Sequence, residues 1–153
     1  MPLRPLVRSV AVAGLLLVAS ATAAASLAAQ GVVSRLTRDQ LADYVKGEGF
    51  GTIEVQDSVT LTTRMEGWKV ALTITSGGES VYAYFGRTGT RATLRAVNDW
   101  NRDIRYSRAY IDEDGDPVLE LDLDLAGGVM PERIRDFLRT VRQSVSRFAA
   151  EVK

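Results

Sequence analysis

The sequence predicts an α+β domain in which helices pack on one face of an antiparallel sheet of about five strands. Apolar residues recur at helical spacing in three stretches, residues 36–47, 90–101 and 131–148. Between them, residues 51–85 and 104–125 alternate apolar and polar side chains with a period of two. Short glycine-containing turns join the alternating stretches, which favours hairpins and therefore antiparallel pairing. The expected order of elements is α-βββ-α-ββ-α.

The first and last helices have the clearest sequence signals. Thr37 and Gln40 fit a capping box, in which each side chain bonds the backbone N–H of the other residue, and Gly47 is a natural stop. The middle helix is expected over Thr90 to Asn101. Pro131 suits the first turn of the last helix. That helix carries one apolar stripe, made of Ile134, Phe137, Leu138, Val141, Val145 and Phe148.

The first group of strands is predicted as a meander of three or four strands. Short alternating stretches precede Thr63, residues 68–75 alternate cleanly from Trp68 onwards, and residues 81–85 form a short apolar strand. Breakers at residues 66–67 and 76–79 join these stretches as hairpins.

The second hairpin is predicted to span Ile104 to Asp112 and Val118 to Leu125, with Asp114-Gly115 as a two-residue turn. That turn sets the pairing of every residue along both strands. The apolar face would pair Ile104 with Leu125, Tyr106 with Leu123, Arg108 with Leu121 and Tyr110 with Leu119. The other face would pair Arg105 with Asp124, Ser107 with Asp122, Ala109 with Glu120 and Ile111 with Val118.

Arg108 is the one charged residue that this pairing turns toward the apolar face. Its stem can pack there while the charged head reaches the rim. Alternatively, it is a buried cation held by Asn98, by Asn101 or by a carbonyl at the end of the middle helix. The sequence is compatible with both arrangements of the Arg108 side chain.

Asn98, Trp100 and Asn101 gather at the end of the middle helix, where they either cap the helix or bind a ligand. Trp100 falls off the apolar side of that helix and is expected to cover the sheet edge. Together with the hairpin they give the candidate binding residues, which are Asn98, Trp100, Asn101, Arg105, Arg108 and Tyr110.

The composition excludes several functions. The 153 residues contain no His and no Cys, so the usual general base, the thiolate nucleophile and the common zinc ligands are missing. Nineteen basic residues balance nineteen acidic ones, which gives no field for nucleic acid. Asp112, Asp114 and Asp116 do not fit a calcium loop, because Pro117 stands where glycine is needed. We expect no enzyme activity, no metal and no cofactor.

The N-terminus has the pattern of a secretory signal. Arg4 and Arg8 precede an apolar stretch, and small residues follow with possible cleavage after Ala23 or Ala25. We therefore expect a signal peptide at residues 1–25, a flexible lead-in at 26–35 and one domain at 36–153, exported to the periplasm or secreted. The alternative is an uncleaved leader that anchors the protein in a membrane.

Four segments resemble the signature of the YbjN-like family in order and spacing. They are Asn98 to Arg102, Tyr106 to Tyr110, Asp112 to Asp116 and Asp124 to Val129. The family is described as regulators of sensory transduction with no defined molecular activity. The resemblance implies a fold similar to that of type III secretion chaperones. Such domains commonly form dimers and bind extended segments of other proteins. It supplies no catalytic residues.

These observations favour a non-enzymatic binding or regulatory module of the bacterial envelope that recognises a protein segment. Its expected surface is the sheet face or edge that the helices leave uncovered, including Trp68, Tyr82, Tyr84 and the row of Arg105 and Glu120. An exposed strand edge would accept an extended peptide by strand addition. The alternatives are a self-associating assembly factor and, less favoured, an enzyme that uses carboxylates or a metal.

Overall fold

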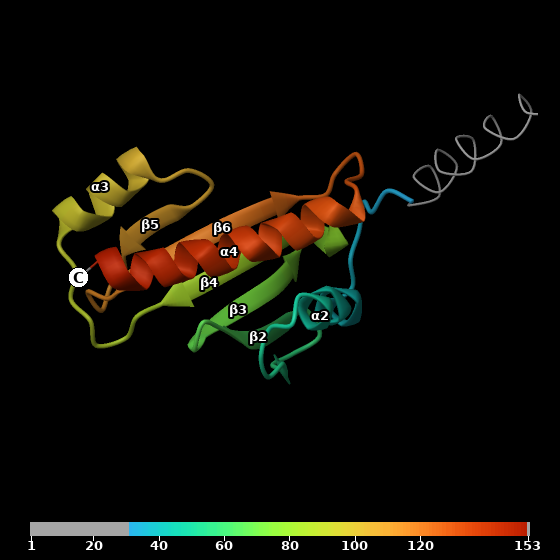
Figure 1. The fold of residues 1–153 in the computed structure, drawn as a ribbon, viewed down its shortest axis with the longest axis horizontal. Coiled ribbons are helices and arrows are strands. Elements are labelled where there is room, and N and C mark those ends of the chain that lie inside the picture. The colour runs from blue at the N-terminus through green and yellow to red at the C-terminus, as the bar shows by residue number, and fades with distance from the viewer. Residues whose placement is uncertain (1–30, 153) are drawn as a thin grey trace, which may run out of the picture. The chain divides into compact units, whose positions relative to one another are not determined.

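The computed structural model describes residues 31–152, and Figure 1 shows their fold. The expected signal peptide at residues 1–25 and its cleavage sites lie outside the described residues. In chain order the elements are α2 (Arg38–Gly47), β1 (Glu54–Val55), β2 (Thr60–Met65), β3 (Trp68–Thr75), a short 3₁₀ turn (Ser76–Gly78), β4 (Ser80–Gly86), α3 (Leu94–Asp103), β5 (Arg108–Ile111), β6 (Pro117–Asp124) and α4 (Pro131–Glu151).

Within residues 31–152, six strands form one antiparallel sheet in the order β1-β2-β3-β4-β6-β5. The sheet thus has one strand more than the five written in the predicted order, because the first meander contains four strands. The lead-in is held against the domain at its described end. There Val33 and Val129 exchange two backbone hydrogen bonds of 2.8 and 3.0 Å.

The capping box at the start of α2 is confirmed. Thr37 Oγ1 accepts a hydrogen bond from the backbone N–H of Gln40, and Gln40 Oε1 accepts one of 2.9 Å from the backbone N–H of Thr37. Two backbone donors that the first turn would leave free are satisfied in this way.

The apolar stripe of α4 is also confirmed, and it forms the centre of the core. All six predicted residues are buried. α4 lies across the sheet in front of β4 and β6 (Figure 1). Phe148 packs edge-to-face against Trp100 of α3 and Phe85 of β4, with ring centres 5.1 and 6.2 Å apart.

All three described helices bury side chains in the same core as one face of the sheet, so the predicted one-sided packing is confirmed. Leu61, Leu72, Val81 and Leu121 represent the inward positions of β2, β3, β4 and β6. No helix within residues 31–152 covers the other face, which we call the outer face. Its central residues are Thr62, Ala71, Tyr82, Tyr84, Arg108, Tyr110, Val118, Glu120 and Asp122.

The predicted pairing of the second hairpin is wrong by one residue. Arg108 lies opposite Glu120, Ala109 opposite Leu119 and Tyr110 opposite Val118. The cause is the turn, which has three residues and not two. The N–H of Asp112 bonds the carbonyl of Asp116, and the N–H of Gly115 bonds the carbonyl of Asp112. Since side chains alternate along a strand, the shift exchanges the faces of β5.

Two consequences follow for the predicted site. Ala109 enters the core, while Arg108 and Tyr110 lie on the outer face. β5 is also shorter than the predicted strand, because Tyr106 has a left-handed backbone with φ of 67° and this conformation interrupts an extended chain. Ile104 and Arg105 therefore precede β5 and pair with no strand.

In the part of the chain from residue 31 to 152, no helix is both long enough and apolar enough to span a membrane.

Candidate functional site

The outer face carries a carboxylate that is almost completely covered. Glu120 is 5% exposed, although it lies on the side of the sheet without helices. Tyr82 reaches it from β4, and Arg108 and Tyr110 reach it from β5. We call these four residues the Glu120 cluster.

The two oxygens of Glu120 have separate partners. Oε1 accepts hydrogen bonds from the hydroxyls of Tyr82 and Tyr110, the latter at 2.7 Å. Oε2 accepts two hydrogen bonds from the Arg108 guanidinium, from Nε at 2.9 Å and from Nη2. Charge-assisted bonds of this kind are stronger than neutral ones. The carboxylate therefore holds three side chains in place and presents no free lone pair for general-base catalysis.

The cluster has a consistent electrostatic character. Burial favours the neutral acid at Glu120, but hydrogen bonds from Tyr82, Arg108 and Tyr110 outweigh it and hold the pKa of Glu120 below its usual value. Burial, followed by the hydrogen bond to Glu120, raises the pKa of Tyr110 to about 12. The same two causes raise the pKa of Tyr82. At neutral pH, Glu120 is thus ionised and both phenols keep their protons.

Tyr84 extends the cluster into a wider aromatic surface. Its ring lies over Gly86, where an added Cβ would stand only 3.0 Å from the Tyr84 hydroxyl. A glycine at this position thus leaves room for the Tyr84 side chain. Val118, the neighbour of Gly86 on β6, is fully buried on the same face. Tyr82, Tyr84 and Tyr110 together form a tyrosine surface supported from below by Glu120 and Val118.

Of the six predicted binding residues, Arg108 and Tyr110 belong to this cluster. Arg108 is not a buried cation, because its side chain is 72% exposed. Its partner is Glu120, so the predicted partners Asn98 and Asn101 are wrong. Its guanidinium also lies 5.8 Å from the centre of the Tyr110 ring.

Asn101 and Trp100 have structural roles instead. The Asn101 side chain donates to the carbonyl of Ala109 at 2.8 Å and accepts from its N–H at 2.9 Å, so it pairs with the free edge of β5 as a neighbouring strand would. Trp100 is buried and donates its indole N–H to Ser107 at 3.0 Å. These contacts fasten the end of α3 to β5.

Two further expectations are corrected. Arg105 does not pair with Asp124, because it lies before β5, which begins at Arg108. Trp68 is not on the outer face. It packs edge-on against Phe85 on the helix side with ring centres 5.7 Å apart. Asn98 is exposed on α3 and makes no contact with the partners predicted for it, so its binding role stays a prediction.

The acidic residues that were compared with a calcium loop, Asp112, Asp114 and Asp116, form the turn between β5 and β6. Asp112 Oδ1 accepts hydrogen bonds from the backbone N–H groups of Asp114 and Asp116, at 3.1 and 2.8 Å. This is the local bonding of an Asx turn, and it accounts for the acidic run without a metal.

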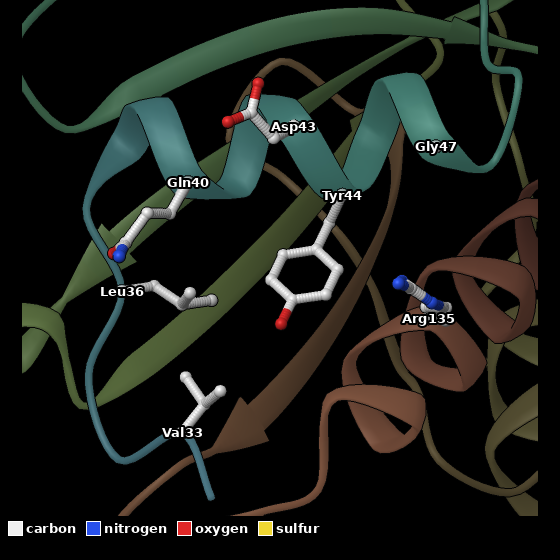
Figure 2. Close-up of a pocket in the computed structure, with 7 residues that line it drawn as sticks. All are labelled: Val33, Leu36, Gln40, Asp43, Tyr44, Gly47 and Arg135. Carbon is white, nitrogen blue, oxygen red and sulfur yellow. The ribbon is translucent and has the colours of Figure 1, made fainter. Parts of the chain in front are cut away.

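A hollow lies between α2 and the start of α4 (Figure 2). Its volume is about 410 Å³, and it is lined by Val33, Leu36, Gln40, Asp43, Tyr44, Gly47 and Arg135. The Arg135 guanidinium lies 5.2 Å from the centre of the Tyr44 ring and 3.6 Å from Glu132. Arg135 is therefore already engaged, which makes this hollow a weaker candidate than the outer face.

Comparison with known proteins supports the resemblance seen in the motifs. Residues 37–153 match the YbjN family, described as "Putative bacterial sensory transduction regulator". Curated proteins give no match. The structure is similar to that of YbjN from E. coli, described as "a putative transcription regulator", with a TM-score of 0.58 and 14% identity over 80% of this chain and 97% of that one.

The structure is also similar to that of the Yersinia pestis type III secretion chaperone SycH, which was crystallised with a stable fragment of YscM2. The TM-score is 0.53, with 15% identity over 74% of this chain and 96% of that one. At such identities the likeness concerns the fold alone, and it confirms the predicted chaperone-like α+β architecture. Because the family match covers residues 37–153, which is well over half of the chain, this protein belongs to the YbjN family.

Proposed function

We propose that this protein is a non-enzymatic binding module that recognises a segment of another protein on its outer face, and that it acts as a regulator through this contact. The main support for this proposal is the tyrosine surface, in which Tyr82 and Tyr110 are fixed by hydrogen bonds to the buried Glu120. SycH, which has a similar fold, was crystallised with a protein fragment.

The tyrosine surface suits a protein partner for a physical reason. Tyrosine offers a large apolar ring and a polar tip with few rotatable bonds, and it is enriched at protein interfaces. Two of the three rings are already held by Glu120. Because these side chains are already ordered in the free protein, they lose little conformational entropy on binding, which lowers the entropic cost of association.

The outermost strands of the sheet are poor alternatives for this contact. The free edge of β5 is occupied at Ala109 by the side chain of Asn101. β1, at the opposite edge, consists only of Glu54 and Val55. Short or covered edge strands resist pairing with another chain. The outer face of the sheet is therefore the better candidate surface.

We further propose that the protein acts in the bacterial envelope after export. The support is the cationic start, the apolar stretch and the small residues before Ala25, which are typical of a cleaved signal. N-terminal sequencing of the protein from its native host tests this. A mature start near Ala24 or Ser26 supports export, whereas a start at Met1 or Pro2 contradicts cleavage.

Site-specific photocrosslinking in living cells tests the binding function. A photoreactive amino acid replaces Tyr84 on the outer face, and in a matched control it replaces Arg95, which is highly exposed on α3. We expect one recurrent protein to be crosslinked at Tyr84 and not at Arg95. Recovery of a second copy of this chain would instead support the self-associating alternative. Equal crosslinking at both positions, or none at Tyr84, would contradict the proposal.

A further inference from the structure

β6 runs on past the end of its pairing with β5. β5 pairs with Pro117 to Glu120, whereas β6 continues to Asp124. Figure 1 shows β6 extending beyond β5. On the other side, β4 pairs with β6 all the way to Asp124. Among the described residues, the stretch from Leu121 to Asp124 therefore has a strand neighbour on one side only.

The backbone of Asp122 faces the unpaired side. Leu125 donates its N–H to Glu79, just before β4. Because peptide groups alternate in direction along a strand, Leu123 and Leu121 also face β4, and Asp122 faces away from it. A donor and an acceptor are thus available at Asp122 for a further strand. A backbone edge of this kind is the usual template for strand addition.

The loop between α3 and β5 prevents the chain from placing its own strand beside Leu121 to Asp124. Tyr106 has φ of 67° and leaves the line of β5, and its side chain is 75% exposed. Trp100 fixes the following residue through its bond to Ser107. The conformation of the α3–β5 connection therefore leaves this stretch of β6 without a second neighbouring strand.

A groove lies beside the free stretch, between this loop and α4. One part has a volume of about 340 Å³ and is lined by Tyr106, Leu121, Asp122, Arg133, Asp136, Phe137 and Thr140. A second part of about 300 Å³ shares Tyr106 and Thr140 with it and continues along α4. Leu121 and Phe137 are buried and give the groove an apolar floor.

The two sides of the free stretch differ in charge. Leu121 and Leu123 point to the core side, whereas Asp122 and Asp124 are exposed on the outer face. Arg108, the cation of β5 on that face, is already bonded to Glu120. In a sheet, residues directly opposite each other share a face, and opposite charges stabilise such pairs. A strand beside β6 would therefore place apolar residues over Leu121 and Leu123 and cations beside Asp122.

We propose that the free edge of β6, from Leu121 to Asp124, binds an extended segment of a partner protein as an added strand, in which apolar residues alternate with Lys or Arg. This inference rests on the proposed function and names the backbone register and the charge of the segment that is recognised. The added strand would lie next to the Glu120 cluster and extend the outer face.

A synthetic peptide tests the proposal on the unmodified protein. The probe is a short fluorescein-labelled peptide in which Val and Lys alternate, and binding is followed by fluorescence anisotropy. N-methylation of the Lys peptide groups, which would face Asp122, removes the ladder bonds. N-methylation of the Val peptide groups, which face away, leaves them. We expect the first change to weaken binding about tenfold and the second to have little effect.

Charge exchange gives the second measurement. Replacing Lys by Glu in the peptide should weaken binding, and Asp122→Lys should reverse that preference. Asp43→Lys on the exposed side of α2 is the control and should keep the original preference. Absence of binding by every peptide, or equal effects of the two N-methylations, would overturn the inference.

The same variants separate this inference from the proposed function. If the partner crosslinked at Tyr84 binds the Asp122→Lys protein as well as the wild type, the outer face binds a partner and the free edge of β6 does not take part. If the peptide behaves as expected but no partner is crosslinked at Tyr84, strand addition at β6 is supported and partner binding on the outer face is contradicted.

Discussion

Arg108 lies directly opposite Glu120 across the β5–β6 pair and donates two hydrogen bonds to one of its oxygens. The pairing leaves the other oxygen for Tyr82 and Tyr110. Had the hairpin kept the predicted register, Arg108 would have faced Leu121 and the carboxylate would have had no cation. The length of one turn thus determines whether the outer face carries an ordered polar cluster.

Glu120→Gln should lower the free energy of unfolding at neutral pH by roughly 1–3 kcal/mol, because hydrogen bonds from a cation and two phenols to a carboxylate are replaced by weaker ones. The folded pKa of Glu120 lies below its value of 4.5 in the unfolded chain. Its stabilising contribution is therefore complete above that pH and is lost as the pH falls through the folded pKa. The difference between wild type and variant should shrink in acid.

Urea unfolding at neutral pH and at about pH 3 measures this difference. Asp122→Asn, an exposed change on the same strand and face, is the control and should alter stability little. A difference between Glu120→Gln and wild type that stays constant down to acid pH would show that the carboxylate charge is not the source of the effect.

Alkali should weaken the fold through the two phenols of the cluster. The folded pKa of Tyr110 is about 12 and that of Tyr82 is also raised, so the unfolded chain loses these protons first, above its pKa of 10.0. Stability is complete below that pH and declines as the pH rises toward the folded values. The double variant Tyr82→Phe/Tyr110→Phe should therefore lose less stability than the wild type between about pH 8 and pH 11. Equal losses in both proteins, measured by urea unfolding, would contradict this assignment.

Asn101→Ala should destabilise the protein by roughly 1–2 kcal/mol, because both backbone groups of Ala109 lose their partner. Asn98→Ala, three residues earlier on the same helix and exposed, is the matched control and should be nearly neutral. Thermal unfolding of both variants measures the contrast. Similar melting temperatures for the two would mean that Asn101 does not hold the edge of β5.

Gly115→Ala should cost about 1 kcal/mol, because the turn requires φ of +85° at this position and a Cβ makes that conformation unfavourable even where space is free. Gly47→Ala is the matched control. It lies at the end of α2 without a positive φ and with open space around it, so alanine should be neutral or slightly stabilising. The free energy of unfolding should therefore fall for Gly115→Ala and stay the same or rise slightly for Gly47→Ala, and equal losses in both variants would contradict this.

The sequence was sufficient for the elements whose signals are local. The capping box at Thr37 and Gln40 and the apolar stripe of α4 depend on residues a few positions apart, and both are confirmed. The sidedness of the sheet also followed from simple alternation. Such features need no knowledge of distant contacts.

The pairing register of the β5–β6 hairpin could not be predicted from such local signals. Asp-Gly fits a two-residue turn, but glycine is equally required at the last position of a three-residue turn. The side chain of Asp112, which bonds the N–H groups of Asp114 and Asp116, favours the longer turn. This bonding is the sequence signal that could have corrected the prediction.

The Glu120 cluster was missed because it is assembled across three strands. Glu120 was predicted to point outward with Asp122 and Asp124, and it does, but its burial depends on Tyr82, which lies 38 residues earlier. The order β4-β6-β5 brings both tyrosines to the same carboxylate. Strand order of this kind cannot be derived from periodicity.

The central claim is that the outer face binds a protein segment through its tyrosine surface, and the affinity of the partner crosslinked at Tyr84 tests it most directly. The dissociation constant would be measured for the wild type, for Tyr84→Ala and for Arg95→Ala. We predict that Tyr84→Ala weakens binding by roughly tenfold or more, as truncation of a central aromatic contact does, and that Arg95→Ala leaves it unchanged. Equal dissociation constants for all three proteins would contradict the account.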